Sequence, residues 1–163
     1  MFTRRKFVLS SVGAASVLGL SSRVSLGVDA KAPRTFEVTH TDAEWRKLLS
    51  REAYEVLRHE GTERPGSSPL NKEKRAGTFA CAGCDLPLFS STTKFESGTG
   101  WPSFWKPLDN AVSTSTDTAF GMSRTEVLCR RCGGHLGHVF DDGPPPTGLR
   151  YCMNGVALTF KPA

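Results

Sequence analysis

Two pairs of cysteines constrain the fold of this chain more than any other feature. Cys81 and Cys84 form one C-x-x-C pair, Cys129 and Cys132 form a second, and glycine lies inside the first pair and directly after the second. Such turns present thiolates to one tetrahedral ion, and glycine lets the backbone fold closely around sulfur. Four thiolates leave no open coordination position, so the pattern predicts a structural zinc site. Because the two pairs lie far apart in sequence, the fold has to bring them together.

Two other interpretations of the four cysteines stay open at this level. An oxidising compartment would permit two disulfides, although a disulfide within C-x-x-C is usually a redox element and not a structural link. A thiol-disulfide oxidoreductase would likewise need a reactive pair of cysteines free of metal. Metal occupancy separates both from the zinc site that we favour.

Cys152 is the one cysteine outside these pairs, and it is the candidate nucleophile. If residues 149–158 form a strand, the side chains of Arg150, Cys152 and Asn154 alternate onto one face. A guanidinium beside a thiol favours the thiolate, which is the attacking form. The alternative is a buried cysteine that acts as a small hydrophobic residue.

Two histidines and an aspartate lie close to this cysteine in sequence. His135 and His138 precede it, and Asp142 follows closely enough to orient an imidazole or hold a water molecule. The imidazoles would supply an acid that protonates a leaving group. Extra metal ligation or structural hydrogen bonding is the alternative for the histidines. Trp101, in an aromatic loop between glycines at 98–104, is a candidate wall for a small pocket or else a core residue.

The remaining sequence predicts a mainly β domain behind two short helices. Thr41 and Glu44 match a capping box, and Ser50 is a candidate cap for a second helix that ends at Gly61. Apolar residues at helical spacing follow each cap: Trp45, Leu48 and Leu49 in the first helix, and Ala53, Tyr54 and Leu57 in the second. Residues 62–77 are typical of a loop. Antiparallel strands are then expected at 78–80, 86–89, 111–115, 125–128, 138–140 and 151–160.

Residues 1–30 are typical of a targeting segment. A basic start that includes Arg4 and Arg5 precedes an apolar run at 7–20 and a possible small-residue cleavage site. The start resembles the twin-arginine export signal, so we expect an exported, periplasmic protein without stable membrane insertion after processing. An ordinary secretory signal or an uncleaved anchor is the alternative. A lead-in at 31–40 and one domain at 41–163 complete the predicted organisation.

The charge of the chain does not favour nucleic acid as a partner. The formal net charge is +5, and four basic residues against one acidic residue place +3 of it in the first thirty residues. The remaining +2 is too weak a surplus to predict a polyanionic ligand. We expect a monomer.

Taken together, these motifs resemble the methionine-R-sulfoxide reductases, the MsrB family, over roughly residues 41–161. The residues that carry the resemblance lie at 44–47, 61–65, 81–84, 97–104, 135–140 and 150–154. The resemblance implies a β fold of two antiparallel sheets in a barrel-like arrangement. It also implies a zinc ion held by the four paired cysteines and Cys152 as the nucleophile.

The resemblance further implies a mechanism on oxidised proteins or peptides. Cys152 thiolate attacks the sulfoxide sulfur of methionine-R-sulfoxide, and His138 helps to protonate the sulfoxide oxygen with support from His135, Asp142 and Asn154. Trp101 packs on the methyl group, with Phe140 as a second substrate-binding residue. Methionine leaves, and the cysteine remains as a sulfenic acid.

One position departs from the pattern of many members of this family. Thr99 stands where a second, resolving cysteine is expected. The resemblance then implies a form with one reactive cysteine, which a thioredoxin-like protein or a small thiol reduces directly. A zinc-ribbon-like binding module without catalysis is the alternative function, but it gives no reason for residues 150–154 or for the histidine segment.

Overall fold

The computed structural model describes residues 35–163. The predicted targeting segment, with its two arginines, and the start of the lead-in lie outside the described residues. Residues 35–40 form neither helix nor strand, and the Val38 N–H donates to the Arg131 carbonyl at 3.1 Å. Along residues 35–163, none of the helices has the length and apolar character needed to cross a membrane.

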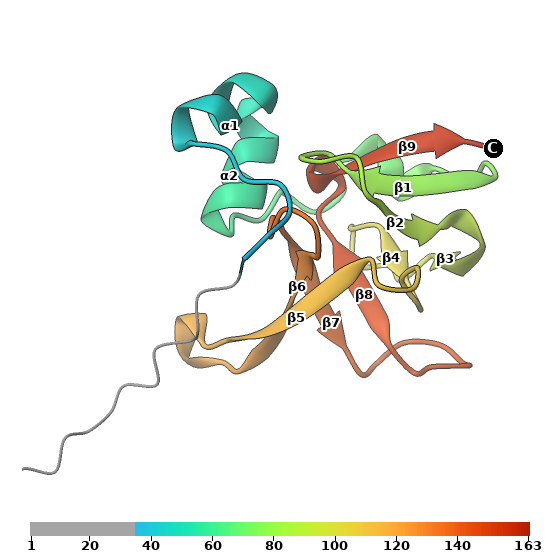
Figure 1. Ribbon diagram of the computed structural model, residues 1–163. Coiled ribbons are helices and arrows are strands. Elements are labelled where there is room, and N and C mark those ends of the chain that lie inside the picture. The colour runs from blue at the N-terminus through green and yellow to red at the C-terminus, as the bar shows by residue number, and fades with distance from the viewer. Residues whose placement is uncertain (1–34) are drawn as a thin grey trace, which may run out of the picture. The chain divides into compact units, whose positions relative to one another are not determined.

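Both predicted helices are present, as α1 (Asp42–Leu48) and α2 (Arg51–His59) (Figure 1). The capping box is confirmed: the Glu44 N–H donates to the Thr41 hydroxyl, and the Glu44 carboxylate accepts from the Thr41 N–H. Ser50 caps α2, which ends at His59 and is followed by the left-handed cap residue Glu60 and then Gly61. The predicted apolar stripe is wrong at Leu48, which is 60% exposed, because the short α1 buries only Trp45.

Nine strands and four short 3-10 helices follow within residues 60–163. The strands are β1 (Gly77–Cys81), β2 (Pro87–Ser90), β3 (Lys94–Phe95), β4 (Ser103–Phe104), β5 (Val112–Asp117), β6 (Arg124–Cys129), β7 (His135–Phe140), β8 (Arg150–Met153) and β9 (Leu158–Pro162). The 3-10 helices are η1 (Pro69–Lys72), η2 (Ser91–Thr93), η3 (Ala119–Gly121) and η4 (Gly155–Ala157).

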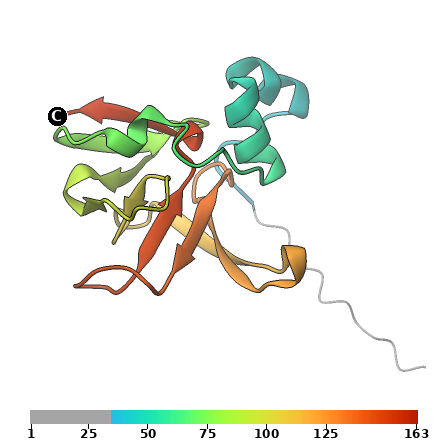
Figure 2. The ribbon, with the colours of Figure 1, turned by 180° about the vertical axis from the view of Figure 1, so that it is seen from behind.

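The strands build two antiparallel sheets, which confirms the predicted fold class. One sheet has the order β2-β1-β9, and the other has the order β3-β4-β8-β7-β6-β5. Neither forms a closed barrel within residues 35–163, so barrel-like describes the arrangement only loosely. The long loop of the β7–β8 hairpin is visible from behind (Figure 2). Helix α2 packs against β7 and η4.

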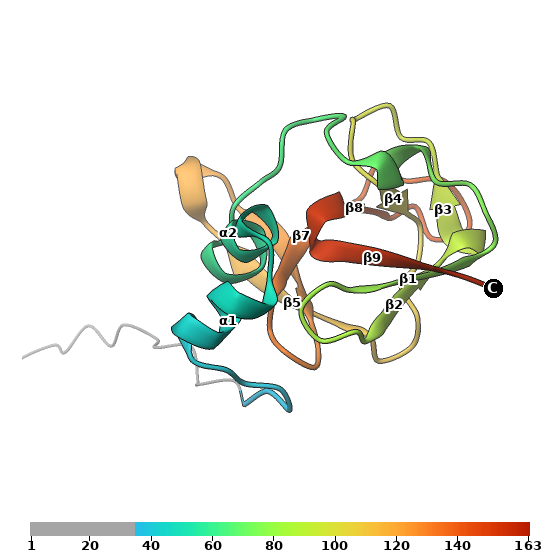
Figure 3. The same cartoon turned by 90° about the horizontal axis from the view of Figure 1, so that it is seen from above.

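The single strand predicted at 151–160 is wrong. The chain leaves β8 after Met153, turns through η4 and enters the other sheet as β9 (Figure 3). A contact distant in sequence accounts for the break, since the Glu63 carboxylate accepts hydrogen bonds from the N–H groups of Gly155 and Val156 at 2.7 and 3.0 Å. A β-carbon at Gly155 would lie 2.0 Å from the Ser68 hydroxyl, so glycine is required at this turn.

Phenylalanine rings fill the space between the two sheets. Phe79 of β1 and Phe89 of β2 both pack on Phe104 of β4, with ring centroids 4.9 and 4.4 Å apart. All three side chains have no exposed surface. The short strand β4, which pairs with β8, is therefore anchored from the opposite sheet, because aromatic rings dominate core packing.

Candidate active site

The strand register places polar residues from four strands in one row across the larger sheet. Glu126 pairs with His138, His138 pairs with Cys152, and Cys152 pairs with Ser103. Residues directly opposite each other in antiparallel strands project from the same face. The fold therefore places a thiol between an imidazole and a hydroxyl that lie far from it in sequence.

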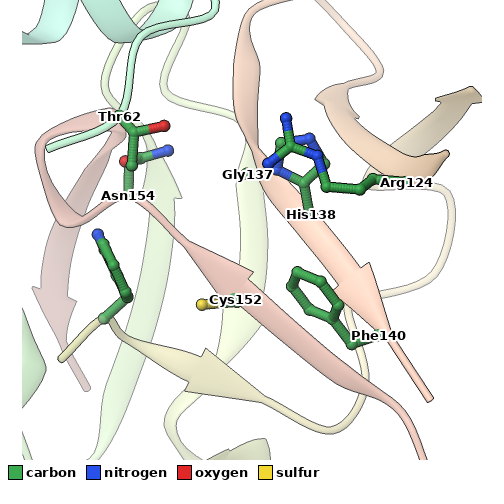
Figure 4. Close-up of a pocket in the computed structure, with 8 residues that line it drawn as sticks. Thr62, Arg124, Gly137, His138, Phe140, Cys152 and Asn154 are labelled. Carbon is green, nitrogen blue, oxygen red and sulfur yellow. The ribbon is translucent and has the colours of Figure 1, made fainter. Parts of the chain in front are cut away.

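Cys152 opens into a cavity of about 130 Å³. Figure 4 shows it on β8 between two groups: His138 and Phe140 on the neighbouring strand, and Thr62 and Asn154 on the other side. The lining residues are Thr62, Trp101, Arg124, Gly137, His138, Phe140, Cys152 and Asn154. Of the predicted site residues, the structure gathers here the cysteine, one histidine, the asparagine and both aromatic residues.

Burial and charge act in opposite directions on the thiol of Cys152. Its partial burial raises the pKa, whereas hydrogen bonding to Thr99, the charge of Arg150 and the hydroxyl of Ser103 lower it. The net shift is upward. Arg150 thus favours the thiolate, as expected from the sequence, but burial outweighs its effect on the pKa.

His138 is oriented by an aspartate that the sequence analysis did not select. Its Nε2 lies 2.8 Å from Oδ2 of Asp117, at the end of β5. Hydrogen bonds from the Ala119 N–H and from His138 hold the pKa of Asp117 at about 2, so the carboxylate is ionised and can only accept. The proton of a neutral His138 is therefore assigned to Nε2. Burial lowers the pKa of His138, and Asp117 partly opposes that shift.

His135 does not reach the cavity. Its side chain is 3% exposed, and its Nδ1 lies 2.8 Å from Oε1 of Glu126, which is also buried. The ring packs edge-on against the ring of His138 at a centroid distance of 5.3 Å. The structure thus brings His135 behind His138, where it supports that ring and contacts no cavity surface.

Asp142 and Arg150 form an ion pair. The guanidinium of Arg150 donates through Nε and NH2 to the two oxygens of Asp142, both at 2.8 Å, and these bonds lower the pKa of Asp142. The guanidinium also lies 4.4 Å from the centroid of the Phe140 ring, a cation–π contact. Asp142 therefore orients Arg150, whereas the predicted role of orienting an imidazole belongs to Asp117.

Glu63 connects the cavity wall to the turn after β8. Its carbonyl accepts from Nε1 of Trp101 at 3.2 Å, and its N–H donates to Oδ1 of Asn154 at 3.0 Å. Its carboxylate binds the N–H groups of η4. Residues 61–65 carry a motif, but the role of Glu63 could not be predicted from the sequence, because its partners lie at 101 and 154–156.

The four paired cysteines meet at the ends of two strands. Cys81 ends β1 and Cys129 ends β6, and the four Sγ atoms lie within 4.8 Å of one another. None of them forms a disulfide; Cys81 and Cys132 have Sγ atoms 3.7 Å apart. Four sulfurs at about 2.3 Å from a tetrahedral ion would lie about 3.8 Å from one another. The geometry therefore fits a metal, and the four sulfurs are not paired as disulfides.

Comparisons with known proteins agree with this arrangement. The family model described as the SelR domain matches residues 49–162. A protein of Pseudomonas putida strain W619 named peptide methionine sulfoxide reductase MsrB is 59% identical over 127 residues, which cover 77% of this chain and 96% of the relative.

Two other organisms carry relatives with the same name. The one from Leptospira interrogans is 53% identical over 77% of this chain and 97% of the relative. The one from Thiobacillus denitrificans is 57% identical over 75% of this chain and 93% of the relative. With the thiol, imidazole and four-sulfur cluster in place, these matches show that the chain belongs to the MsrB family of methionine-R-sulfoxide reductases.

Proposed function

We propose that this chain reduces methionine-R-sulfoxide in oxidised proteins and peptides, with Cys152 as the nucleophile. One observation carries the assignment of the nucleophile: Cys152 alone among the five cysteines lies outside the metal cluster and lines a cavity with an imidazole and aromatic rings. A thiol so placed is reachable by one side chain of a substrate. The non-catalytic binding module explains the cluster but not this cavity.

The reaction transfers one oxygen atom to Cys152. Its thiolate forms a bond to the sulfoxide sulfur while a proton reaches the sulfoxide oxygen. The oxygen then moves to the sulfur of Cys152, so that a new sulfur–oxygen bond forms there while the sulfoxide sulfur–oxygen bond and the bond between the two sulfurs break. Methionine is released, and the protonated oxygen remains on Cys152 as a sulfenic acid. His138 is the proposed proton donor, because it lies in the cavity one strand away from the thiol. When protonated, it donates through Nδ1, since Nε2 is bonded to Asp117.

The other site residues hold the substrate and the two reacting groups. Trp101 and Phe140 are the proposed apolar walls for the methyl end of the substrate. Asn154 is bound by Glu63 and by the Leu136 carbonyl, so its role is to position the cavity wall beside Cys152. His135 supports His138, and Arg150, held by Asp142, favours the thiolate of Cys152.

The sulfenic acid requires an external thiol. Thr99 Oγ1 lies 3.8 Å from the Cys152 sulfur, and a hydroxyl at this position cannot form a disulfide. A first thiol, from a thioredoxin-like protein or a small molecule, attacks the sulfenic sulfur and releases water. A second thiol attacks the mixed disulfide and restores Cys152, so two thiols are oxidised per methionine formed.

Zinc is the proposed occupant of the four-cysteine cluster. Four thiolates without an open position suit a structural zinc ion, which would link the ends of β1 and β6 and take no part in oxygen transfer.

Replacing the nucleophile tests the assignment of Cys152. Cys152→Ser should lower reduction of methionine-R-sulfoxide by at least about three orders of magnitude, since a serine hydroxyl is not ionised at neutral pH. Turnover is measured with the separated R and S sulfoxides and a dithiol reductant. Mass spectrometry of the wild type treated with substrate alone should find one added oxygen on Cys152. Wild-type turnover by the serine variant would show that another group attacks.

The pH dependence tests His138 and Asp117 together. The productive form combines a thiolate with an imidazolium, so kcat/KM should fall below the lowered pKa of His138 and above the raised pKa of Cys152, with a plateau between. Asp117→Asn removes a carboxylate that raises the pKa of His138. It should therefore move the acid limb of the profile to lower pH. The plateau value of kcat/KM should fall tenfold for each unit by which the pKa of His138 falls.

The exposed Asp109 gives a matched control for that substitution. Asp109→Asn removes the same charge outside the cavity lining and should leave the profile unchanged. An acid limb that stays in place in Asp117→Asn would contradict the proposed role of the Asp117–His138 pair.

Metal content and thermal stability test the zinc site. The wild type should contain one zinc per chain, and Cys84→Ser should lose it and lower the Tm by at least about 10 °C, because structural zinc supplies folding free energy directly. Cys152→Ser is the matched control, since it removes a thiol outside the cluster and should keep both zinc and Tm. A wild type that contains no metal and has the same Tm as Cys84→Ser would rule out a structural metal.

We also propose export by the twin-arginine route, on the support of the sequence at residues 1–30 alone. Replacing Arg4 and Arg5 by lysine keeps the charge and should block export, as measured by the share of the protein in the periplasm. A substitution of Lys6 by arginine is the control and should export normally. Unimpaired export of the double lysine variant would leave the ordinary secretory signal as the better interpretation.

A further inference from the structure

A second cavity adjoins the catalytic one. It has a volume of about 530 Å³ and lies between α2, the loop at 61–67 and Val156. Its lining residues are Arg51, Glu52, Glu55, Val56, Gly61, Thr62, Glu63, Arg64, Ser67 and Val156. Thr62 belongs to the lining of both cavities, and in Figure 4 it stands at the edge of the catalytic one. A chain that leaves the catalytic cavity past Thr62 therefore enters the second.

The two volumes indicate different occupants. The catalytic cavity, at about 130 Å³, has room for one side chain but is well below the roughly 300–1,000 Å³ of typical small-molecule sites. The second cavity falls within that range. If the oxidised methionine side chain fills the first cavity, the polypeptide that carries it has to lie outside, and the second cavity offers it a surface.

The loop between the cavities is fixed before any substrate arrives. Glu63 binds Trp101, Asn154 and the N–H groups of η4, and the Gly66 N–H donates to the Gly100 carbonyl at 2.7 Å. A rigid loop loses little conformational entropy when it binds a ligand. The side chains that the loop presents to the second cavity, Thr62 and Arg64, thus stand on a preorganised support.

Four charged side chains of this cavity are available for a ligand. Arg64 and Arg51 provide two guanidinium groups, and Glu52 and Glu55 provide two carboxylates. None of the four enters any of the ion pairs formed among residues 35–163. Val56, which is buried, and Val156 add apolar surface. A mixture of both charges with apolar surface suits a polypeptide segment better than a small ion of one sign.

We propose that the second cavity binds the residues that flank the oxidised methionine in a polypeptide substrate, and that its charged side chains select among flanking sequences. The inference rests on the proposed function, because it assigns the substrate class of the same site. Arg64 favours acidic flanking residues, and Glu55, across the cavity on α2, favours basic ones.

Charge reversal on each side of the cavity tests this inference. The substrates are N-acetyl-methionine-R-sulfoxide and pentapeptides with a central methionine-R-sulfoxide flanked on both sides by aspartate or by lysine. The quantity measured is kcat/KM for each peptide divided by kcat/KM for the N-acetyl compound, with a dithiol reductant. Division by the small substrate removes any effect on the chemical step.

The two reversals should act with opposite sign. Arg64→Glu should lower the ratio for the aspartate peptide by about three- to tenfold and raise that for the lysine peptide, because one attractive contact becomes repulsive. Glu55→Lys should lower the ratio for the lysine peptide and raise that for the aspartate peptide. Both effects should shrink in 0.5 M salt, a concentration of about three times the physiological value, since salt screens surface charges.

Lys74→Glu is the matched control. Lys74 is exposed and lies outside both linings, so this reversal changes the net charge by the same amount as Arg64→Glu and should leave every ratio unchanged. Equal ratios in the wild type and both cavity variants, or the same shift in Lys74→Glu, would overturn the inference. A wild type that reduces neither the peptides nor the N-acetyl compound would instead overturn the proposed function.

Discussion

The meeting of four sulfur atoms at the ends of β1 and β6 is the contact on which the rest of the structure depends. Cys81 belongs to the smaller sheet and Cys129 to the larger one, so the cluster fixes one end of each sheet against the other. Strand β9 pairs with β1 and follows β8 through η4. Strand β8, which carries Cys152 in the larger sheet, is thus connected through η4 to the smaller sheet.

Features with local causes could be predicted from the sequence, whereas contacts made by strand register could not. The capping box of Thr41 and Glu44 needs only neighbouring residues, and so do the turns that present the cysteines. The imidazole of His138 is bonded instead to Asp117, twenty-one residues earlier. Asp142 is closer in sequence, but the β7–β8 hairpin places it beside Arg150.

The burial of the Cys152 thiol could not be predicted from the linear sequence either. Alternation along β8 correctly placed Arg150 on the face of Cys152, and the guanidinium does lower the pKa of that thiol. Burial also removes the sulfur from water, and this effect acts more strongly in the opposite direction and raises the pKa. A reactive thiol that is mostly protonated at rest depends on its neighbours in the cavity for activation, as the charge of one arginine is insufficient.

The loop at 61–67 belongs to the site through contacts with residues that are distant in sequence. The carboxylate of Glu63 shapes the turn after β8, its carbonyl holds the ring of Trp101, and its N–H holds Asn154. The opposite surface of the same loop carries Arg64 into the second cavity. Because one segment forms the wall between the reacting sulfur and the surface beyond, a displacement of Glu63 would alter the catalytic cavity and the adjoining surface together. The shapes of the two cavities are therefore coupled through this loop.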